Sequence, residues 1–97
     1  MMTPEEMLLS IKQTIRTHLS DPSYRLFLFG SRATGTARKF SDVDVGIEGR
    51  TPVSPTALAN IQEALEESDI PCNVDIVDFS QTSDRFRSFA KKYALPL

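Results

Sequence analysis

The chain has 97 residues, a mass of 10.8 kDa, and a composition that is 40% hydrophobic and 25% charged. These values are ordinary for a folded globular protein, so they exclude a disordered, collagen-like or disulfide-rich chain, and the length predicts a single domain over residues 1–97. Eleven Lys and Arg against thirteen Asp and Glu give a net charge of -2, which excludes a basic field that would attract nucleic acid or membranes.

Targeting and membrane segments are not expected either. No apolar stretch approaches the roughly 18 residues that cross a bilayer, and the N-terminus has neither the basic nor the apolar region of a signal peptide. The single cysteine, Cys72, can form no internal disulfide, which suits a reducing compartment. We therefore expect a soluble, cytoplasmic domain without a membrane partner.

The first quarter of the sequence predicts a helix followed by a buried strand. Thr3 can cap the helix, Pro4 suits its first position, and Glu6 completes a capping box. Apolar residues then recur at spacings of three and four, namely Met7, Leu8, Ile11, Ile15 and Leu19. Beyond a polar turn, the apolar run 24–29 predicts a strand that ends abruptly at Gly30.

The middle of the sequence predicts a short helix and a second strand. After a tight turn at Gly30, we expect a helix over about 31–37 and then a polar loop. Residues 42–47 alternate as Asp, Val, Asp, Val, Gly and Ile, which predicts a strand with one apolar face and one carboxylate face.

The last part of the sequence predicts two further helices with a strand between them. Ser54 and Pro55 open the third helix with a cap followed by a proline, and residues 73–79 alternate as a strand. The final helix carries an apolar stripe that consists of Phe86, Phe89, Ala90 and Tyr93. We expect it to pack against the core, and the alternative is that so small a chain offers its aromatic rings to a protein partner. This order of elements predicts a two-layer α/β (α+β) fold in which helices flank a small mixed sheet of about three to four strands.

Two carboxylates two residues apart are the first candidates for chemistry. Asp42 and Asp44 leave the same face of one strand, where they repel one another unless a cation joins them. Hard oxygen ligands at this spacing suit Mg²⁺, which commonly shares its sites with substrate phosphates. The alternative is that both residues are strand-end carboxylates that face solvent.

A third carboxylate could lie beside them on the next strand, where Asp75 and Asp78 are the candidates. Because Asp75 and Asp78 are three positions apart along a strand, their side chains leave opposite faces, and only one of them can point at Asp42 and Asp44. We favour Asp75, because it is more central in the strand and is flanked by apolar residues.

Gly30 and Ser31 stand where a strand turns into a helix, which predicts an anion site. The glycine lets the backbone approach a ligand closely, and the helix N-terminus directs free N–H groups and a partial positive charge outward. A phosphate-binding turn, a short helix and a strand with paired carboxylates together suit a metal–nucleotide complex.

In this order the residues resemble a known family. Gly30, Ser31, Gly35 and the segment 41–44 read G-S-x-x-x-G-x-x-x-x-x-S-D-x-D, which is similar to the signature of the polymerase-β-like nucleotidyltransferases, and the compact chain resembles the minimal (MNT, or MntA-like) antitoxins. The resemblance implies that the nucleotide phosphates are bound at Gly30, Ser31, Arg32 and Ser41. It also implies that two Mg²⁺ ions, for which Mn²⁺ can substitute, are held by Asp42, Asp44 and Asp75.

The resemblance implies an enzyme that moves a nucleotide. A hydroxyl deprotonated near Asp75 would attack the α-phosphorus of an NTP, which we expect to be ATP, and pyrophosphate would leave. The expected acceptor is a tyrosine of a HEPN-domain toxin, so the working complex would be heteromeric and nucleic acid is not expected as a direct partner. The alternative is a binding module that neutralises its toxin by covering it.

Overall fold

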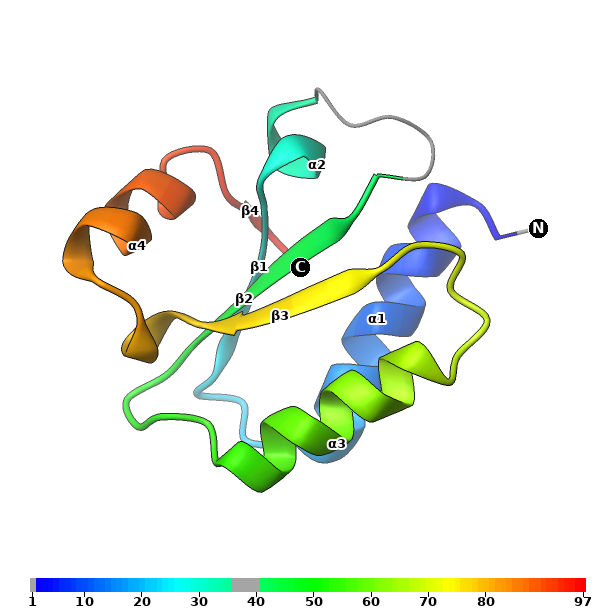
Figure 1. Ribbon diagram of the computed structural model, residues 1–97, viewed down its shortest axis with the longest axis horizontal. Coiled ribbons are helices and arrows are strands. Elements are labelled where there is room, and N and C mark those ends of the chain that lie inside the picture. Colours follow the sequence, from blue (N-terminus) through cyan, green and yellow to red (C-terminus); the bar gives the residue numbers. More distant parts are fainter. Residues whose placement is uncertain (1, 36–40) are drawn as a thin grey trace.

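The computed structural model describes residues 2–35 and 41–97 (Figure 1). Its elements are α1 (Pro4–His18), β1 (Arg25–Phe29), α2 (Ser31–Thr34), β2 (Val43–Glu48), α3 (Pro55–Glu66), β3 (Val74–Asp78), the 3₁₀ helix η1 (Phe79–Gln81), α4 (Asp84–Lys91) and β4 (Leu95–Pro96). The strands form one sheet in the order β3-β2-β1-β4, with β1 antiparallel to β2 and β4, and β2 parallel to β3. The predicted two-layer fold with a small mixed sheet is therefore confirmed.

The helix starts follow the capping residues that the sequence places there. The Glu6 amide donates to the Thr3 hydroxyl at 3.1 Å, and the Thr3 amide donates to the Glu6 carboxylate at 3.0 Å, which completes the capping box of α1. At α3 the Ser54 hydroxyl accepts from the Ala57 amide at 3.1 Å. Local side-chain bonds thus fix where both long helices begin.

One face of the sheet is covered by α1 and α3, which lie side by side beneath it in Figure 1. Alternate residues of β2 point into this layer, and all three are fully buried: Val43, Val45 and Ile47. They meet apolar side chains from both helices, such as Ile11 and Ile61. Because strand residues alternate between faces, the two aspartates that flank Val43 belong to the opposite face.

The opposite face of the sheet is covered at one end by η1 and α4. The fully buried ring of Phe79 packs against Phe29 with ring centroids 5.4 Å apart, and Ala90 of α4 joins this smaller cluster. Asp44 of β2 and Asp75 of β3 lie on this same face, whereas α1 and α3 cover the other one.

Two elements differ from the sequence prediction. Helix α2 ends at Thr34, short of the predicted end near residue 37, because Gly35 adopts a φ of 79° and closes the helix in the left-handed conformation. Residues 36–40 lie outside the described part of the chain. Strand β4 was not expected; its two residues pair with Phe27 and Leu28 of β1.

The apolar stripe of the last helix is exposed rather than buried, so that prediction is wrong for three of its four residues. Phe86, Phe89 and Tyr93 are 41%, 78% and 58% exposed, and only Ala90 is buried. The physical reason is that aromatic side chains from the sheet and from η1 already fill the space beneath the short helix α4. Within residues 2–35 and 41–97, no helix is both long and apolar enough to cross a membrane.

Candidate active site

Carboxylates from two neighbouring strands meet on the open face of the sheet. Asp44 of β2 is in register with Asp75 of β3, and Asp42 lies just before β2 on the same side. Burial, followed by the negative charges of Asp75 and Asp42, raises the pKa of the Asp44 carboxyl. The three sequence-predicted carboxylates are therefore close enough to repel one another.

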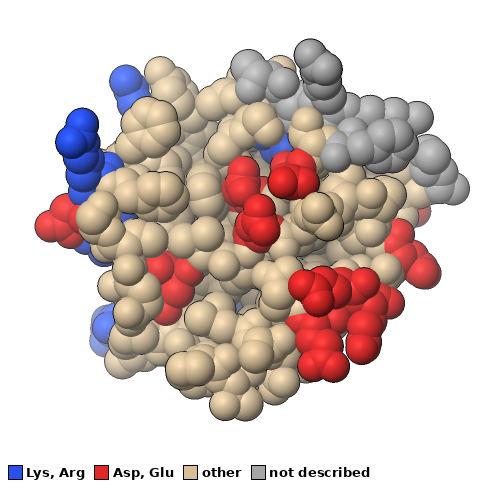
Figure 2. Space-filling view, in the orientation of Figure 1, with Lys and Arg blue, Asp and Glu red and all other residues tan. Residues whose placement is uncertain are grey.

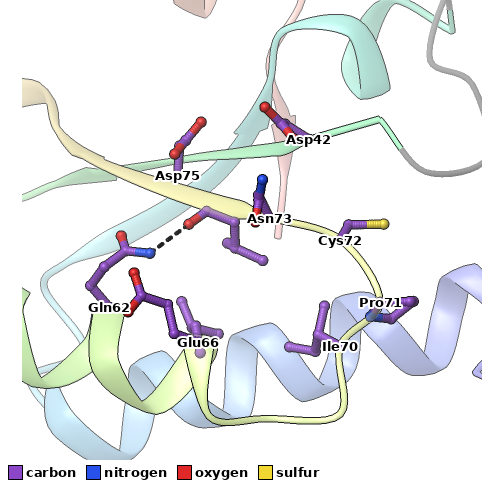
Figure 3. Close-up of a pocket in the computed structure, with 10 residues that line it drawn as sticks. Asp42, Gln62, Glu66, Ile70, Pro71, Cys72, Asn73 and Asp75 are labelled. Carbon is purple, nitrogen blue, oxygen red and sulfur yellow. Dashed lines mark hydrogen bonds between the residues drawn. The ribbon is translucent and has the colours of Figure 1, made fainter.

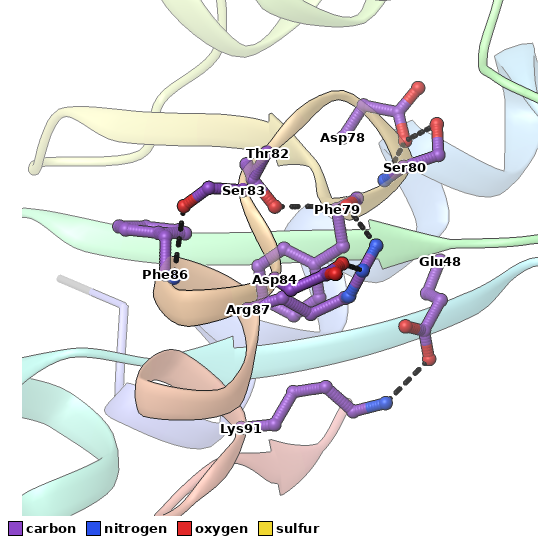
Figure 4. A network of polar contacts seen from close by, with 10 residues as sticks. All are labelled: Glu48, Asp78, Phe79, Ser80, Thr82, Ser83, Asp84, Phe86, Arg87 and Lys91. Carbon is purple, nitrogen blue, oxygen red and sulfur yellow. Dashed lines mark hydrogen bonds and ion pairs between the residues drawn. The ribbon is translucent and has the colours of Figure 1, made fainter.

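Asp78, the alternative third carboxylate, points the other way and has a structural role. It is only 6% exposed, and its carboxylate accepts bonds from the Val53 amide at 2.8 Å, the Ser80 amide at 2.9 Å and the Ser80 hydroxyl at 2.7 Å. Figure 4 shows Asp78 and Ser80 at the start of η1, which this side chain caps. Asp78 thus joins the end of β3 to the loop before α3.

Gly30 lies directly beside Asp44, on the side of β2 away from β3. Phe29 is the register partner of Asp44, and Gly30 follows it with a φ of 73° as the N-cap of α2. A Cβ atom at Gly30 would lie 2.3 Å from Oδ2 of Asp44, so only glycine fits here. The turn at Gly30 and Ser31 therefore adjoins the carboxylates, as a phosphate-binding turn beside a metal site requires.

Arg32 and Ser41, the other two candidates for phosphate binding, are joined to each other by a hydrogen bond. The Arg32 guanidinium donates from Nη2 to the Ser41 carbonyl oxygen at 2.8 Å and to Sγ of Cys72 at 3.3 Å. These bonds tie α2 to the segments that lead into β2 and β3, so Arg32 holds protein groups in addition to any ligand. Nothing in the sequence pairs Arg32 with Cys72, because 40 residues separate them.

A pocket of about 440 Å³ opens next to the carboxylates, between β3 and α3 (Figure 3). Asp42 and Asp75 form its upper rim, and Gln62 reaches from α3 to donate to the Val74 carbonyl oxygen at 2.8 Å. The sequence analysis missed this pocket. Its lining comes from a helix, a loop and a strand, and no short-range pattern joins them.

Comparisons with known proteins agree with this geometry. The family described as polymerase beta, nucleotidyltransferase matches residues 10–94. The chain is 40% identical over 84 residues to the Haemophilus influenzae protein named probable protein adenylyltransferase MntA, covering 87% of this chain and 73% of that protein. The chain belongs to the polymerase-β nucleotidyltransferase family. The sequence-based resemblance is thereby confirmed, and the chain is an enzyme of the nucleotidyltransferase type.

Solved structures share the fold of this nucleotidyltransferase. A structure assigned to the minimal nucleotidyltransferases has a TM-score of 0.76 and 27% identity, and the match covers 99% of this chain and 97% of that one. A toxin–antitoxin crystal structure with AMP-PNP has a TM-score of 0.68 at 24% identity, covering 88% of this chain and 70% of that one.

Nucleotidyltransferases of this kind generally use divalent metals, and the donor set here fits such an ion. Among the residues that the structure describes, no three carboxylate, thiol or imidazole groups converge closely enough to hold an ion as they stand. The negative charges of Asp42 and Asp75 beside Asp44 are nevertheless an arrangement that a divalent cation would stabilise, and carboxylate oxygen atoms are the ligands that Mg²⁺ prefers.

Proposed function

We propose that this nucleotidyltransferase transfers AMP from ATP to a tyrosine hydroxyl of a HEPN-domain toxin and so acts as its antitoxin. The observation that carries the proposal is the row formed by Gly30, which directly follows β1, Asp44 of β2 and Asp75 of β3. We infer that these neighbours act as the phosphate-binding turn, a metal ligand and the base. The similarity to MntA, which is named a probable protein adenylyltransferase, supports a protein acceptor.

Each residue of the row has a distinct task in this proposal. The turn at Gly30 and Ser31 binds the β- and γ-phosphates through backbone N–H groups and the serine hydroxyl. Asp42 and Asp44 would hold Mg²⁺, and Asp75 would contribute to a second ion. When bound, the two ions stabilise charge on the attacking and leaving oxygen atoms.

Asp75 then receives the proton of the acceptor hydroxyl. The freed oxygen forms a bond to the α-phosphorus, the bond from this phosphorus to the bridging oxygen breaks, and pyrophosphate leaves in line. Asp75 suits this task because its side chain is exposed at the sheet edge, within reach of a macromolecule. Asp78 does not suit this task, because it is buried and its carboxylate already accepts hydrogen bonds from Val53 and Ser80.

The direct test uses labelled ATP, Mg²⁺, this protein and a HEPN-domain protein, for which the product of the neighbouring gene is the first candidate. We expect the partner to gain the mass of one or more AMP groups on tyrosine, and the Asp44→Asn variant to transfer none. Modification of this chain alone, or no transfer from any nucleotide, would contradict the proposal. One free, half-buried cysteine suits the reducing cytoplasm in which we propose that the reaction occurs.

A second candidate function is that of a binding module, and the exposed aromatic side chains of the last helix favour it. Phe89 and Tyr93 together offer apolar surface that a protein partner could cover. A toxin that is fully inhibited in the complex, without any covalent modification, would support this candidate instead.

A further inference from the structure

The order of Gly30, Asp44 and Asp75 across the sheet determines the side from which the acceptor hydroxyl approaches. In an in-line displacement, the attacking and leaving oxygen atoms lie on opposite sides of the α-phosphorus. The turn at Gly30, which would bind the leaving pyrophosphate, lies on the β1 side of Asp44. The hydroxyl must therefore arrive from the β3 side, past Asp75.

On that side the sheet ends and the pocket begins. Within the described sheet β3 is an edge strand with β2 as its only neighbour. The pocket adjoins this edge, and its lining includes apolar side chains beneath the strand and polar groups along it, contributed by Leu65, Ile70, Cys72, Val74, Gln62 and Asn73. A segment that enters here meets Asp75 at the rim (Figure 3).

The edge itself has hydrogen-bonding capacity for an extended segment. The Val43 amide donates to the Asn73 carbonyl oxygen, so alternate residues of β3 turn their backbone groups toward β2. Val74 and Ile76 turn theirs outward, and the amide of Gln62 already reaches the Val74 carbonyl from that side. An added strand could pair with the outward groups of Ile76, one residue beyond Asp75.

Charge indicates which kind of polymer fits. Among the residues that the structure describes, the pocket lining includes three acidic residues, Asp42, Glu66 and Asp75, and neither lysine nor arginine. Figure 2 shows one group of acidic side chains near the middle of this face and a second, larger group below it and to the right. Glu66 itself is the last residue of α3. With Mg²⁺ on Asp42 and Asp75, Glu66 and the other exposed acidic side chains near the end of α3 still repel the phosphates of RNA and attract a cationic polypeptide.

We propose that the outer edge of β3 and the adjoining pocket bind the acceptor as an extended polypeptide segment in which lysine or arginine flanks the hydroxyl residue. This inference rests on the proposed function, since it assigns the acceptor side of the same reaction. Glu66 is then a specificity residue: it contacts the flanking cation and takes no part in nucleotide binding.

The test is an NMR titration of the ¹⁵N-labelled full chain with two peptides, each carrying one tyrosine flanked by lysines or by glutamates. Mg²⁺ and AMPCPP, whose methylene bridge prevents transfer, are added first. We expect nucleotide-induced shifts at Gly30, Ser31 and Asp44. We then expect the lysine peptide to shift the amides of Val74 and Ile76, and the glutamate peptide to bind at least tenfold more weakly.

Charge variants on one helix locate the contact. At about 0.1 M salt, Glu66→Lys should weaken binding of the lysine peptide about tenfold and Glu66→Gln about threefold, because salt screens charges that are more than about 10 Å apart and leaves mainly the closest pair. Glu63→Lys is the matched control: it makes the same charge change one turn earlier on α3, outside the pocket lining, and should change affinity about twofold or less. Both lysines lie near the helix C-terminus, where a cation does not oppose folding.

Any one of several binding results would overturn the inference. The two peptides could bind equally well, neither could bind at millimolar concentration, or their chemical shift changes could be confined to another surface. Equal effects of Glu63→Lys and Glu66→Lys on peptide affinity would also overturn it. Transfer of AMP to the terminal hydroxyl of an RNA would overturn it as well. The proposed function fails separately, if the nucleotide shifts no amide at Gly30, Ser31 or Asp44, whatever the peptides do.

Discussion

Replacing Gly30 with alanine tests the contact between the turn and the carboxylates. The new Cβ atom would lie 2.3 Å from Oδ2 of Asp44, so the carboxylate must move. In addition, residues other than glycine rarely adopt a backbone φ of 73° with a ψ of -152°, and doing so costs about 1–3 kcal/mol. We expect Gly30→Ala to lower the melting temperature by about 5–20 °C.

Gly35→Ala is the matched control, because Gly35 has a similar φ of 79° but no atom of the described residues within 4 Å of its Cβ position. It should show backbone strain alone, about 1–2 kcal/mol. Thermal unfolding and Mg²⁺–ATP titration of both variants separate strain from displacement of Asp44. We expect Gly30→Ala to lose nucleotide affinity at least tenfold and Gly35→Ala to retain most of it.

A double variant isolates the clash. Adding Asp44→Ala to Gly30→Ala removes the carboxylate that the methyl group meets, so part of the lost stability should return, whereas the strain remains. If Gly30→Ala unfolds at the same temperature as Gly35→Ala and binds nucleotide as the parent does, Gly30 does not position the carboxylates and the reasoning is refuted.

Three further variants test other parts of the structure. Without metal, Asp44→Asn should be more stable than the parent at neutral pH by about 0.2–1 kcal/mol. Because folding raises the pKa of this carboxyl, the stability advantage of the variant should appear as the pH rises through the usual aspartate range and vanish below it. Denaturant titrations at several pH values measure this difference. Asp78→Asn should cost about 1–3 kcal/mol by weakening the bonds that a buried carboxylate accepts, and an unchanged melting temperature would contradict its structural role. Phe89→Ser should change stability by no more than about 0.5 kcal/mol, since the ring is 78% exposed; a large loss would place it in the core after all.

Local signals in the sequence were sufficient for most of the fold. The capping box at Thr3 and Glu6 and the alternation around Val43 act over a few residues, so the sequence displays them directly. The structural role of Asp78 also follows from local sequence. An aspartate commonly accepts a hydrogen bond from the N–H group two residues later, as Asp78 does from Ser80, and so forms an Asx turn.

The features that escaped prediction depend on contacts between distant segments. Strand β4 is two residues long and contains a proline, so its pairing with β1 has no pattern of its own. The stripe at Phe86 and Phe89 has helical spacing, but rings from β1 and η1 occupy the space it was expected to fill. The pocket required Gln62, Glu66 and Asp75 to meet from separate elements, which only the folded chain reveals.

The most direct measurement of the central claim is the transfer activity of Asp75→Asn toward the proposed HEPN-domain acceptor, followed by intact mass. Because Asp75 is exposed, the variant should fold, bind Mg²⁺–ATP through Gly30 and Asp44, and form the complex. AMP transfer should nevertheless fall at least 10²-fold, as expected when a general base is lost. Asp69→Asn, an exposed change outside the pocket lining, should transfer at the parental rate. Parental transfer by Asp75→Asn would contradict the assignment of the row across the sheet as the active site.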